Sequence, residues 1–128
     1  IKSEDFVDKD NIYLLGSSIG GVTVATYAVT HTDDIKGIIL QYPAIFLNEQ
    51  AYEIGAEYDV NGYKNPVLFL QGDSDKVVPD KYSIELCDYY NSIDKNHCRM
   101  IIYNGKSHVF TGKYKVIAAK DIYEFINS

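Results

Sequence analysis

The stretch from Asn11 to Gly21, NIYLLGSSIGG, constrains the fold more than any other part of the chain. The four residues from Ile12 to Leu15 are apolar without alternation, which is typical of a strand that is buried on both faces. A glycine-containing turn follows, and apolar residues then recur at helical spacing, at Val22, Val24, Ala25, Ala28 and Val29. The sequence therefore predicts a strand that turns directly into a helix.

The turn itself has the pattern G-x-S-x-G, with Ser18 at its centre. In this pattern the serine occupies a sharp turn that raises its hydroxyl above a sheet. We expect glycine at Gly16 and Gly20 because a Cβ atom there would crowd the strand and the helix. The first N–H groups of the helix would stabilise negative charge beside Ser18 Oγ, as acyl transfer requires. A glycine-rich turn capped by Ser17 or Ser18 is the simpler alternative.

Composition narrows the range of partners. The chain has 128 residues, of which 46% are hydrophobic, so it fits one domain with a sizeable core. Its net charge of −6 argues against binding to nucleic acid or to an anionic membrane surface, since both need basic patches. No apolar run approaches the roughly 20 residues of a membrane span. Cys87 and Cys98 lack C-x-x-C spacing, which favours two buried free thiols over a disulfide or a metal site.

Three further apolar runs predict strands, at 37–42, 66–71 and 98–103. Helices are expected at 18–31, 79–91 and 111–126, and the segment 44–65 predicts one loose helix. Strands that alternate with helices through short connections become parallel neighbours in one sheet. The fold class is therefore α/β, with about four parallel strands that alternate with helices. The last helix is expected to bury Val116, Ala119, Ile122, Tyr123 and Ile126, and the helix before it Ile84, Leu86, Cys87 and Tyr90.

Ser18, Asp75 and His108 each follow the carboxyl end of a different predicted strand. These ends share one edge of a parallel sheet, so we expect the three side chains to meet there. Serine is a weak nucleophile that needs a base such as histidine, and a carboxylate fixes the tautomer of that histidine. Asp73 is an alternative source of the carboxylate.

Other residues with suitable chemistry are less well placed. His31 lies at the predicted end of a helix, where a surface histidine is favoured by the helix dipole. His97 precedes its strand and so belongs to the opposite edge of the sheet. The 12 tyrosines could line a pocket for an aromatic substrate, but tyrosine is also an ordinary residue of cores and rims.

These motifs together resemble those of the α/β-hydrolase superfamily. LLGSSIGG at 14–21 resembles the nucleophile elbow, LQGDSDKVVP at 70–79 the segment that carries the acid, and NGKSHVF at 104–110 the segment that carries the base. The resemblance implies that Ser18 is the nucleophile and His108 the base, and it selects Asp75 as the acid. Ser17 and Gln71 stand where the superfamily usually has histidine.

Among subfamilies, the chain looks most similar to bacterial serine esterases, which include cinnamoyl (feruloyl) esterases and serine-aminopeptidase-like hydrolases. A dienelactone hydrolase would be expected to have cysteine at position 18. The resemblance implies hydrolysis of small carboxylic esters through an acyl-enzyme, with the backbone N–H of Ile19 in the oxyanion hole and with no metal or cofactor. There are two alternatives. One is a peptidase of the same fold, and the other is a truncated, non-catalytic fragment or subunit.

The resemblance covers strands five to eight of the superfamily fold, so residues 1–128 are expected to form one partial domain without its N-terminal half. The chain starts at Ile1 and its only methionine is Met100, which also suggests a fragment. A second oxyanion donor would then be missing, and 44–65 is too short for a large cap. We expect the strand at Ile12 to Leu15 to pair with the missing half or with another copy. A cytoplasmic location is favoured.

Overall fold

The computed structural model describes residues 12–45, 63–93 and 97–128. The polar segment expected before the first strand, and most of the loose helix expected at 44–65, lie outside these ranges. The strands are β1 (Tyr13–Ser17), β2 (Gly37–Gln41), β3 (Val67–Gly72) and β4 (Cys98–Tyr103). The helices are α1 (Ile19–Thr30), α3 (Asp80–Ile93) and α4 (Lys113–Ile126).

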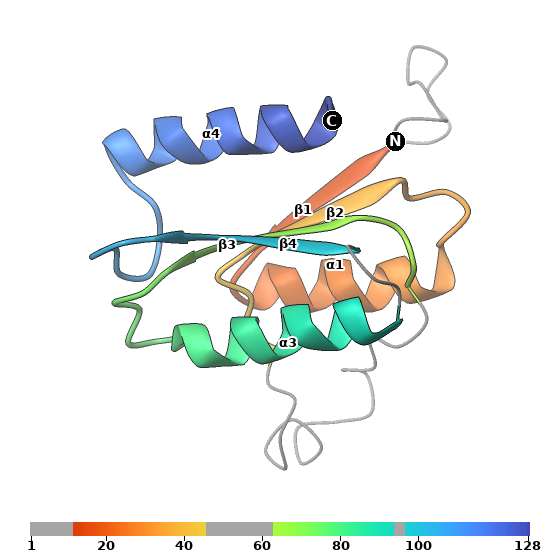
Figure 1. Ribbon diagram of the computed structural model, residues 1–128, viewed down its shortest axis with the longest axis horizontal. Helices are drawn as coiled ribbons and strands as arrows, with labels where there is room; N and C mark the ends of the chain where they lie inside the picture. Colours follow the sequence, from red (N-terminus) through yellow and green to blue (C-terminus); the bar gives the residue numbers. More distant parts are fainter. Residues whose placement is uncertain (1–11, 46–62, 94–96) are drawn as a thin grey trace.

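The four strands form one parallel sheet in the order β1-β2-β3-β4 (Figure 1). Its register aligns Leu15 with Ile39, Ile39 with Leu68, and Leu68 with Arg99. The apolar runs of β2 and β3 are buried almost throughout, as expected for central strands of a parallel sheet. The prediction of parallel strands alternating with helices is confirmed.

Helices cover both faces of the sheet, with α1 and α3 on one side and α4 on the other (Figure 1). One apolar cluster lies on the α1 and α3 side and a second lies under α4. In α1 the expected stripe is present, because Ala25 and Ala28 are fully buried and the three valines pack against the first cluster. None of the described helices is long and apolar enough to cross a lipid bilayer.

The predicted buried side of α4 was wrong at every residue except Ile122. Val116 and Tyr123 are 71% and 69% exposed, and Ala119 and Ile126 are also exposed. The helix instead directs Ala118 and Phe125 to the sheet, with Tyr114 and Ile122 partly buried beside them. Two apolar stripes run along this helix at similar spacing, and only tertiary contact selects one of them. In α3, Leu86, Cys87 and Tyr90 are buried as predicted, but Ile84 is 39% exposed.

The expectation of free thiols was also wrong, because Cys87 and Cys98 form a disulfide. Cys87 lies on the buried side of α3 and Cys98 begins β4. Packing of this helix against the strand places the two Cα atoms 5.6 Å apart, which is an ordinary spacing for a disulfide. The short connection between α3 and β4 thus becomes a covalently closed loop. Spacing along the sequence did not reveal a pairing that depends on how the helix docks.

Candidate active site

Ser18 forms the turn between β1 and α1 on its own, since β1 ends at Ser17 and α1 begins at Ile19. Its backbone has φ 53° and ψ −119°, a strained conformation for a residue other than glycine. Hydrogen bonds hold this turn in place: Ser18 N–H donates to Gln41 O at 3.0 Å, and Ser18 O accepts from Ala44 N at 2.9 Å. Such strain is typical of a functional turn whose surroundings fix it.

The steric reason predicted for the two glycines of the turn holds at Gly16 but not at Gly20. A Cβ at Gly16 would stand 2.8 Å from Cγ2 of Val24, so close approach of strand and helix does require glycine there. A Cβ at Gly20 would meet nothing within 4 Å, so the steric reason predicted for that position was wrong. The crowded glycine of the helix is Gly21, where a Cβ would lie 2.6 Å from Cβ of Pro43.

Ser18, His108 and Asp75 are brought together at the carboxyl edge of the sheet. His108, in the loop after β4, has Nδ1 2.6 Å from Asp75 Oδ2 and Nε2 3.2 Å from Ser18 Oγ. A carboxylate only accepts hydrogen bonds, so Nδ1 carries the proton when the imidazole is neutral. Nε2 is then the acceptor for the hydroxyl of Ser18. The geometry therefore fixes the tautomer that a general base needs.

Asp75 lies in the loop after β3, and its side chain is fully buried. Oδ1 accepts the backbone N–H groups of Val77 and Val78, both at 2.8 Å. Oδ2 accepts from Gln71 Nε2 at 3.3 Å in addition to His108. Both oxygens are thus satisfied, which a buried carboxylate requires. Asp75 is held in one orientation by the backbone of its own loop and by Gln71 of β3.

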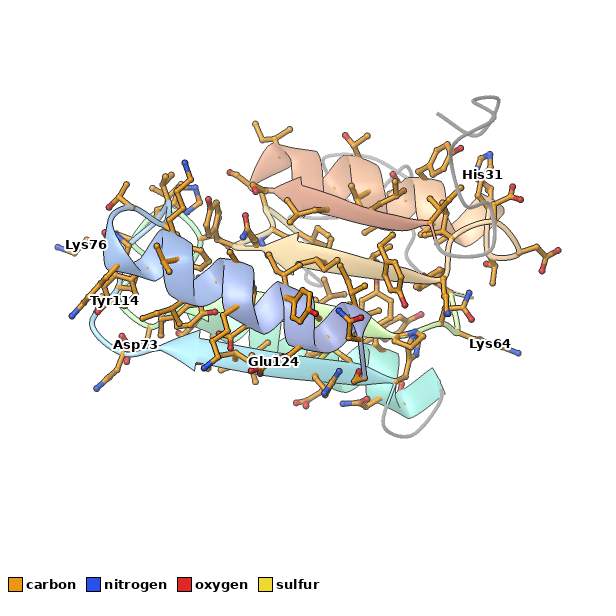
Figure 2. All side chains as sticks on the ribbon, turned by 90° about the horizontal axis from the view of Figure 1, so that it is seen from above. His31, Lys64, Asp73, Lys76, Tyr114 and Glu124 are labelled. Carbon is orange, nitrogen blue, oxygen red and sulfur yellow. A yellow bond between two sulfur atoms is a disulfide. The ribbon has the colours of Figure 1, made fainter. Side chains whose placement is uncertain are left out.

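Asp73, the alternative acid, has another position and other partners. It is exposed, and its Oδ1 accepts Gly105 N–H at 2.7 Å and the hydroxyl of Ser74 at 3.2 Å. The structure therefore places Asp75, and not Asp73, against the imidazole. Figure 2 shows Asp73 near Lys76 and Tyr114 at one end of the sheet, with His31 at the other.

Tyr42 completes the surroundings of His108, and the sequence analysis did not identify it. Its ring centroid lies 4.7 Å from that of the imidazole and 4.8 Å from that of Phe110. Tyr42 is buried and has φ 38°, a second strained residue at the carboxyl edge of the sheet. In the sequence, only the position of Tyr42 directly after β2 and before Pro43 indicated that it lies at the carboxyl edge of the sheet. The ring therefore packs against the imidazole of His108.

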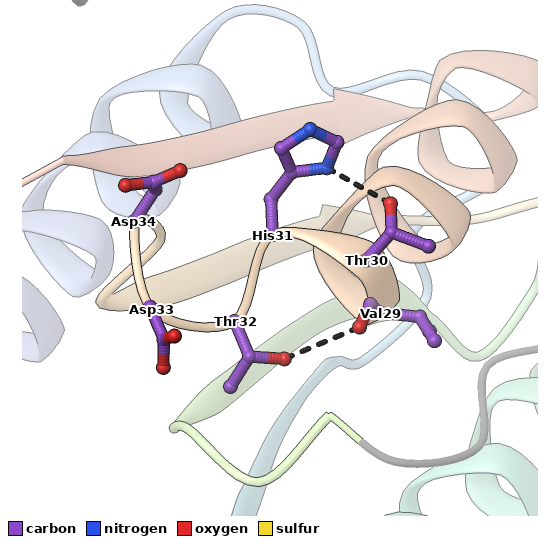
Figure 3. A pocket seen from close by; sticks show the side chains of 6 residues that line it. All are labelled: Val29, Thr30, His31, Thr32, Asp33 and Asp34. Carbon is purple, nitrogen blue, oxygen red and sulfur yellow. Dashed lines mark hydrogen bonds between the residues drawn. The ribbon is translucent and has the colours of Figure 1, made fainter.

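The other histidines lie away from this cluster. His31 ends α1 and lines a hollow with residues of that helix end (Figure 3). Its Nδ1 lies 2.9 Å from Thr30 Oγ1. His97 is buried at the opposite edge of the sheet, with Nδ1 3.1 Å from Tyr90 O. Within the described residues no group of three or more histidine, cysteine, aspartate or glutamate side chains is arranged to hold a metal ion.

An exposed apolar residue follows each member of the cluster within two positions in the sequence. Ile19 follows Ser18 and is 76% exposed, Val77 lies two residues after Asp75 and is 66% exposed, and Val109 follows His108. Val109 has φ 66°, a rare conformation for a β-branched residue.

Comparison with protein families gives a match over nearly the whole chain. The model of the dienelactone hydrolase family matches residues 1–124. The chain belongs to this family. It has Ser18 at the turn between β1 and α1, although cysteine was expected at position 18 for a dienelactone hydrolase itself. No curated protein matches the chain.

Solved structures show the same fold. Est1E from Butyrivibrio proteoclasticus is 23% identical with a TM-score of 0.76, and the match covers 98% of this chain and 64% of Est1E. Dipeptidyl peptidase 4 from Porphyromonas gingivalis is 17% identical (TM-score 0.73; 98% of this chain, 20% of that one). The monoacylglycerol lipase of Paleococcus ferrophilus is 19% identical (TM-score 0.70; 89% and 67%). The described sheet and helices thus form part of an α/β-hydrolase fold, and the chain spans less than two thirds of Est1E.

Proposed function

We propose that this chain carries the catalytic triad of a serine hydrolase that cleaves carboxylic esters. The observation that carries the proposal is the hydrogen-bonded series Asp75, His108 and Ser18, in a member of the dienelactone hydrolase family. The strained turn at Ser18 and the start of α1 support it, because they expose the hydroxyl beside the positive end of a helix.

In the proposed reaction, Ser18 Oγ attacks the ester carbonyl carbon while its proton passes to His108 Nε2. Asp75 stabilises the imidazolium through the Nδ1–H bond. The carbonyl oxygen becomes an oxyanion that accepts the N–H of Ile19, which is the first residue of α1 and therefore has no intrahelical acceptor. The C–O bond then breaks, and the alcohol leaves with the proton from His108.

Water then hydrolyses the acyl-enzyme, with water as the nucleophile and Ser18 as the leaving group. His108 Nε2 takes a proton from a water molecule, and the resulting hydroxide attacks the acyl carbon on Ser18. The acid leaves as Ser18 regains its proton. No redox step occurs, and the residues named supply every proton transfer without a metal or a cofactor.

The substrate is proposed to be a small carboxylic ester, as for the serine esterases that the sequence motifs resemble. Est1E has been solved with ferulic acid bound, which makes methyl ferulate a suitable test compound. A peptidase of the same fold and a non-catalytic fragment are the competing functions.

The test compares three compounds: p-nitrophenyl acetate, methyl ferulate and an aminoacyl-p-nitroanilide. Hydrolysis of an ester, lost in Ser18→Ala, supports the proposal. The matched control is Ser17→Ala, which removes the neighbouring hydroxyl that bonds to Gln41 and retains the nucleophile. Cleavage of the anilide alone would indicate the peptidase. No turnover, together with no labelling of Ser18 by a fluorophosphonate, would indicate a non-catalytic chain.

A further inference from the structure

We propose that Gln71, anchored by Ser83, is a positioning residue that holds the Asp75 loop in the shape that directs Asp75 to His108. This inference rests on the proposed function, since it assigns Gln71 a task within the same site. It concerns the position where related motifs usually have histidine.

Gln71 forms hydrogen bonds to residues that precede and follow Asp75 in the sequence, as well as to Asp75 itself. It lies in β3 and is fully buried, and its Nε2 donates to Val78 O at 3.0 Å, to Gly72 O at 3.2 Å and to Asp75 Oδ2 at 3.3 Å. Val78 in turn donates its N–H to Asp75 Oδ1 at 2.8 Å. The amide therefore binds Asp75 directly and also binds the backbone that holds the other carboxylate oxygen.

The orientation of this amide follows from its partners. Oε1 of Gln71 accepts the hydroxyl of Ser83 at 2.9 Å, and all three partners of Nε2 are oxygen acceptors. In the reversed orientation Oε1 would face those three acceptors, and each of them would lose its hydrogen bond from Gln71. Ser83 lies in α3 and is 1% exposed. It thus anchors Gln71 from the helix that follows the loop.

A neutral amide suits this position. Gln71 donates hydrogen bonds to a buried carboxylate without adding a positive charge, so the charge of Asp75 is left for the imidazolium of His108. Without the donor, Val78 O and Gly72 O would be buried without this partner, and the loop would relax toward other ones. The expected result is a wider range of Asp75 orientations and a looser bond to His108.

The test observes this bond directly by NMR on the 128-residue chain labelled with ¹⁵N. An imidazole Nδ1–H held against a carboxylate gives a strongly deshielded proton resonance, and Asp75→Asn and His108→Ala identify the one that belongs to His108. Ionisable side chains that contact His108 among the described residues are Asp75 and Tyr42. Neither is altered in the variants that test Gln71.

Gln71→Met keeps a similar volume but removes the donor, and we expect the His108 resonance to be lost or broadened beyond detection while a cooperative melt is retained. Ser83→Ala frees the amide without touching Asp75, and we expect a weaker resonance with faster solvent exchange. The control is Ser92→Ala, a serine of the same helix whose hydroxyl donates to Tyr89 O and whose loss should leave the resonance unchanged.

Retention of the wild-type resonance in both Gln71→Met and Ser83→Ala would overturn the proposal. If Gln71→Met does not fold, Ser83→Ala decides alone. Absence of the resonance in the wild type would also overturn it, because the Asp75–His108 bond is its premise. The readout requires no turnover. A chain with neither ester hydrolysis nor labelling of Ser18 by a fluorophosphonate, but with the expected NMR changes, would contradict the proposed function only.

Discussion

Asp73 Oδ1 accepts the backbone N–H of Gly105 at 2.7 Å, which joins the loop that carries Asp75 to the loop that carries His108. A backbone bond from Ser74 N to Lys106 O at 3.0 Å runs beside it. The two acidic residues of the loop thus have separate tasks in the structure: Asp73 fastens one loop to the other, and Asp75 contacts the imidazole.

This separation predicts different outcomes for two matched substitutions. Asp75→Asn removes the negative charge that stabilises the imidazolium, and we expect the rate of Ser18 labelling by a fluorophosphonate to fall by about 10² to 10⁴. Asp73→Asn keeps an oxygen that accepts from Gly105 N–H, and we expect a rate near that of the wild type. Equal losses in both variants would contradict the assignment of the acid.

Tyr42 provides a second comparison, because its ring contacts the imidazole and its hydroxyl is not needed for that contact. Tyr42→Phe should label at nearly the wild-type rate. Tyr42→Leu removes the flat surface that limits rotation of His108, and we expect labelling about 10- to 100-fold slower, as for other small displacements of reacting groups. Labelling is measured below the melting temperature of each variant. An unchanged rate in Tyr42→Leu would show that the ring has no part in orienting His108.

The disulfide should affect stability and not the site. Reduction of Cys87–Cys98, which are 11 residues apart, is expected to lower the free energy of unfolding by about 2 to 3 kcal/mol through loss of the loop constraint. The bond links α3 to the start of β4, at the amino ends of the strands, whereas Ser18 lies at the carboxyl ends. Urea unfolding with and without reductant measures the change, and labelling of Ser18 in the folded, reduced chain should be unaltered. A large loss of labelling there would contradict this separation.

The sequence was sufficient for those parts of the fold whose cause is local. Continuous apolar runs predicted four parallel strands, and the placement of Ser18, Asp75 and His108 after three of them predicted that the side chains would meet. Both predictions follow from the rule that parallel strands share one carboxyl edge. The hydrogen bonds among the three residues are present, while their catalytic roles stay a proposal.

The features that the sequence did not reveal depend on how elements dock. The disulfide requires α3 to lie on β4, and the buried side of α4 was decided by contact with the sheet. The need for glycine at Gly21 arises from Pro43, which is distant in sequence. The position of Tyr42 against His108 likewise brings together residues 66 positions apart, from two separate loops. Periodicity and motif spacing contain no information on such contacts.

The proposed oxyanion hole has one named donor, Ile19 N–H, and the resemblance to α/β-hydrolases assigned the second to a part of the fold before the strands found here. Loss of one such donor slows catalysis by about 10² to 10³. We therefore expect the 128-residue chain alone to hydrolyse p-nitrophenyl acetate at well below about 1 per second, with residual turnover abolished in Ser18→Ala. Turnover at about 1 to 10³ per second would show that the chain supplies a complete oxyanion hole.

The last prediction concerns β1, which is an outermost strand of the described sheet. Within that sheet it pairs with β2 alone (Figure 1). The strand contains no proline or lysine, and Leu15 within it is 48% exposed, so two features that usually discourage pairing of an edge strand are absent from β1. We propose that the chain associates through this edge, either with a complementary fragment or with a second copy.

Sedimentation of the purified chain at micromolar concentration should therefore show species larger than a monomer. Leu15→Lys places a charge in the edge strand and should shift the distribution toward monomer. Val116→Lys is the matched control, because it adds the same charge at a 71% exposed position on α4, away from the edge. A compact wild-type monomer with a cooperative melt would refute the proposal, and equal effects of the two lysines would show that net charge, and not the edge of β1, controls association.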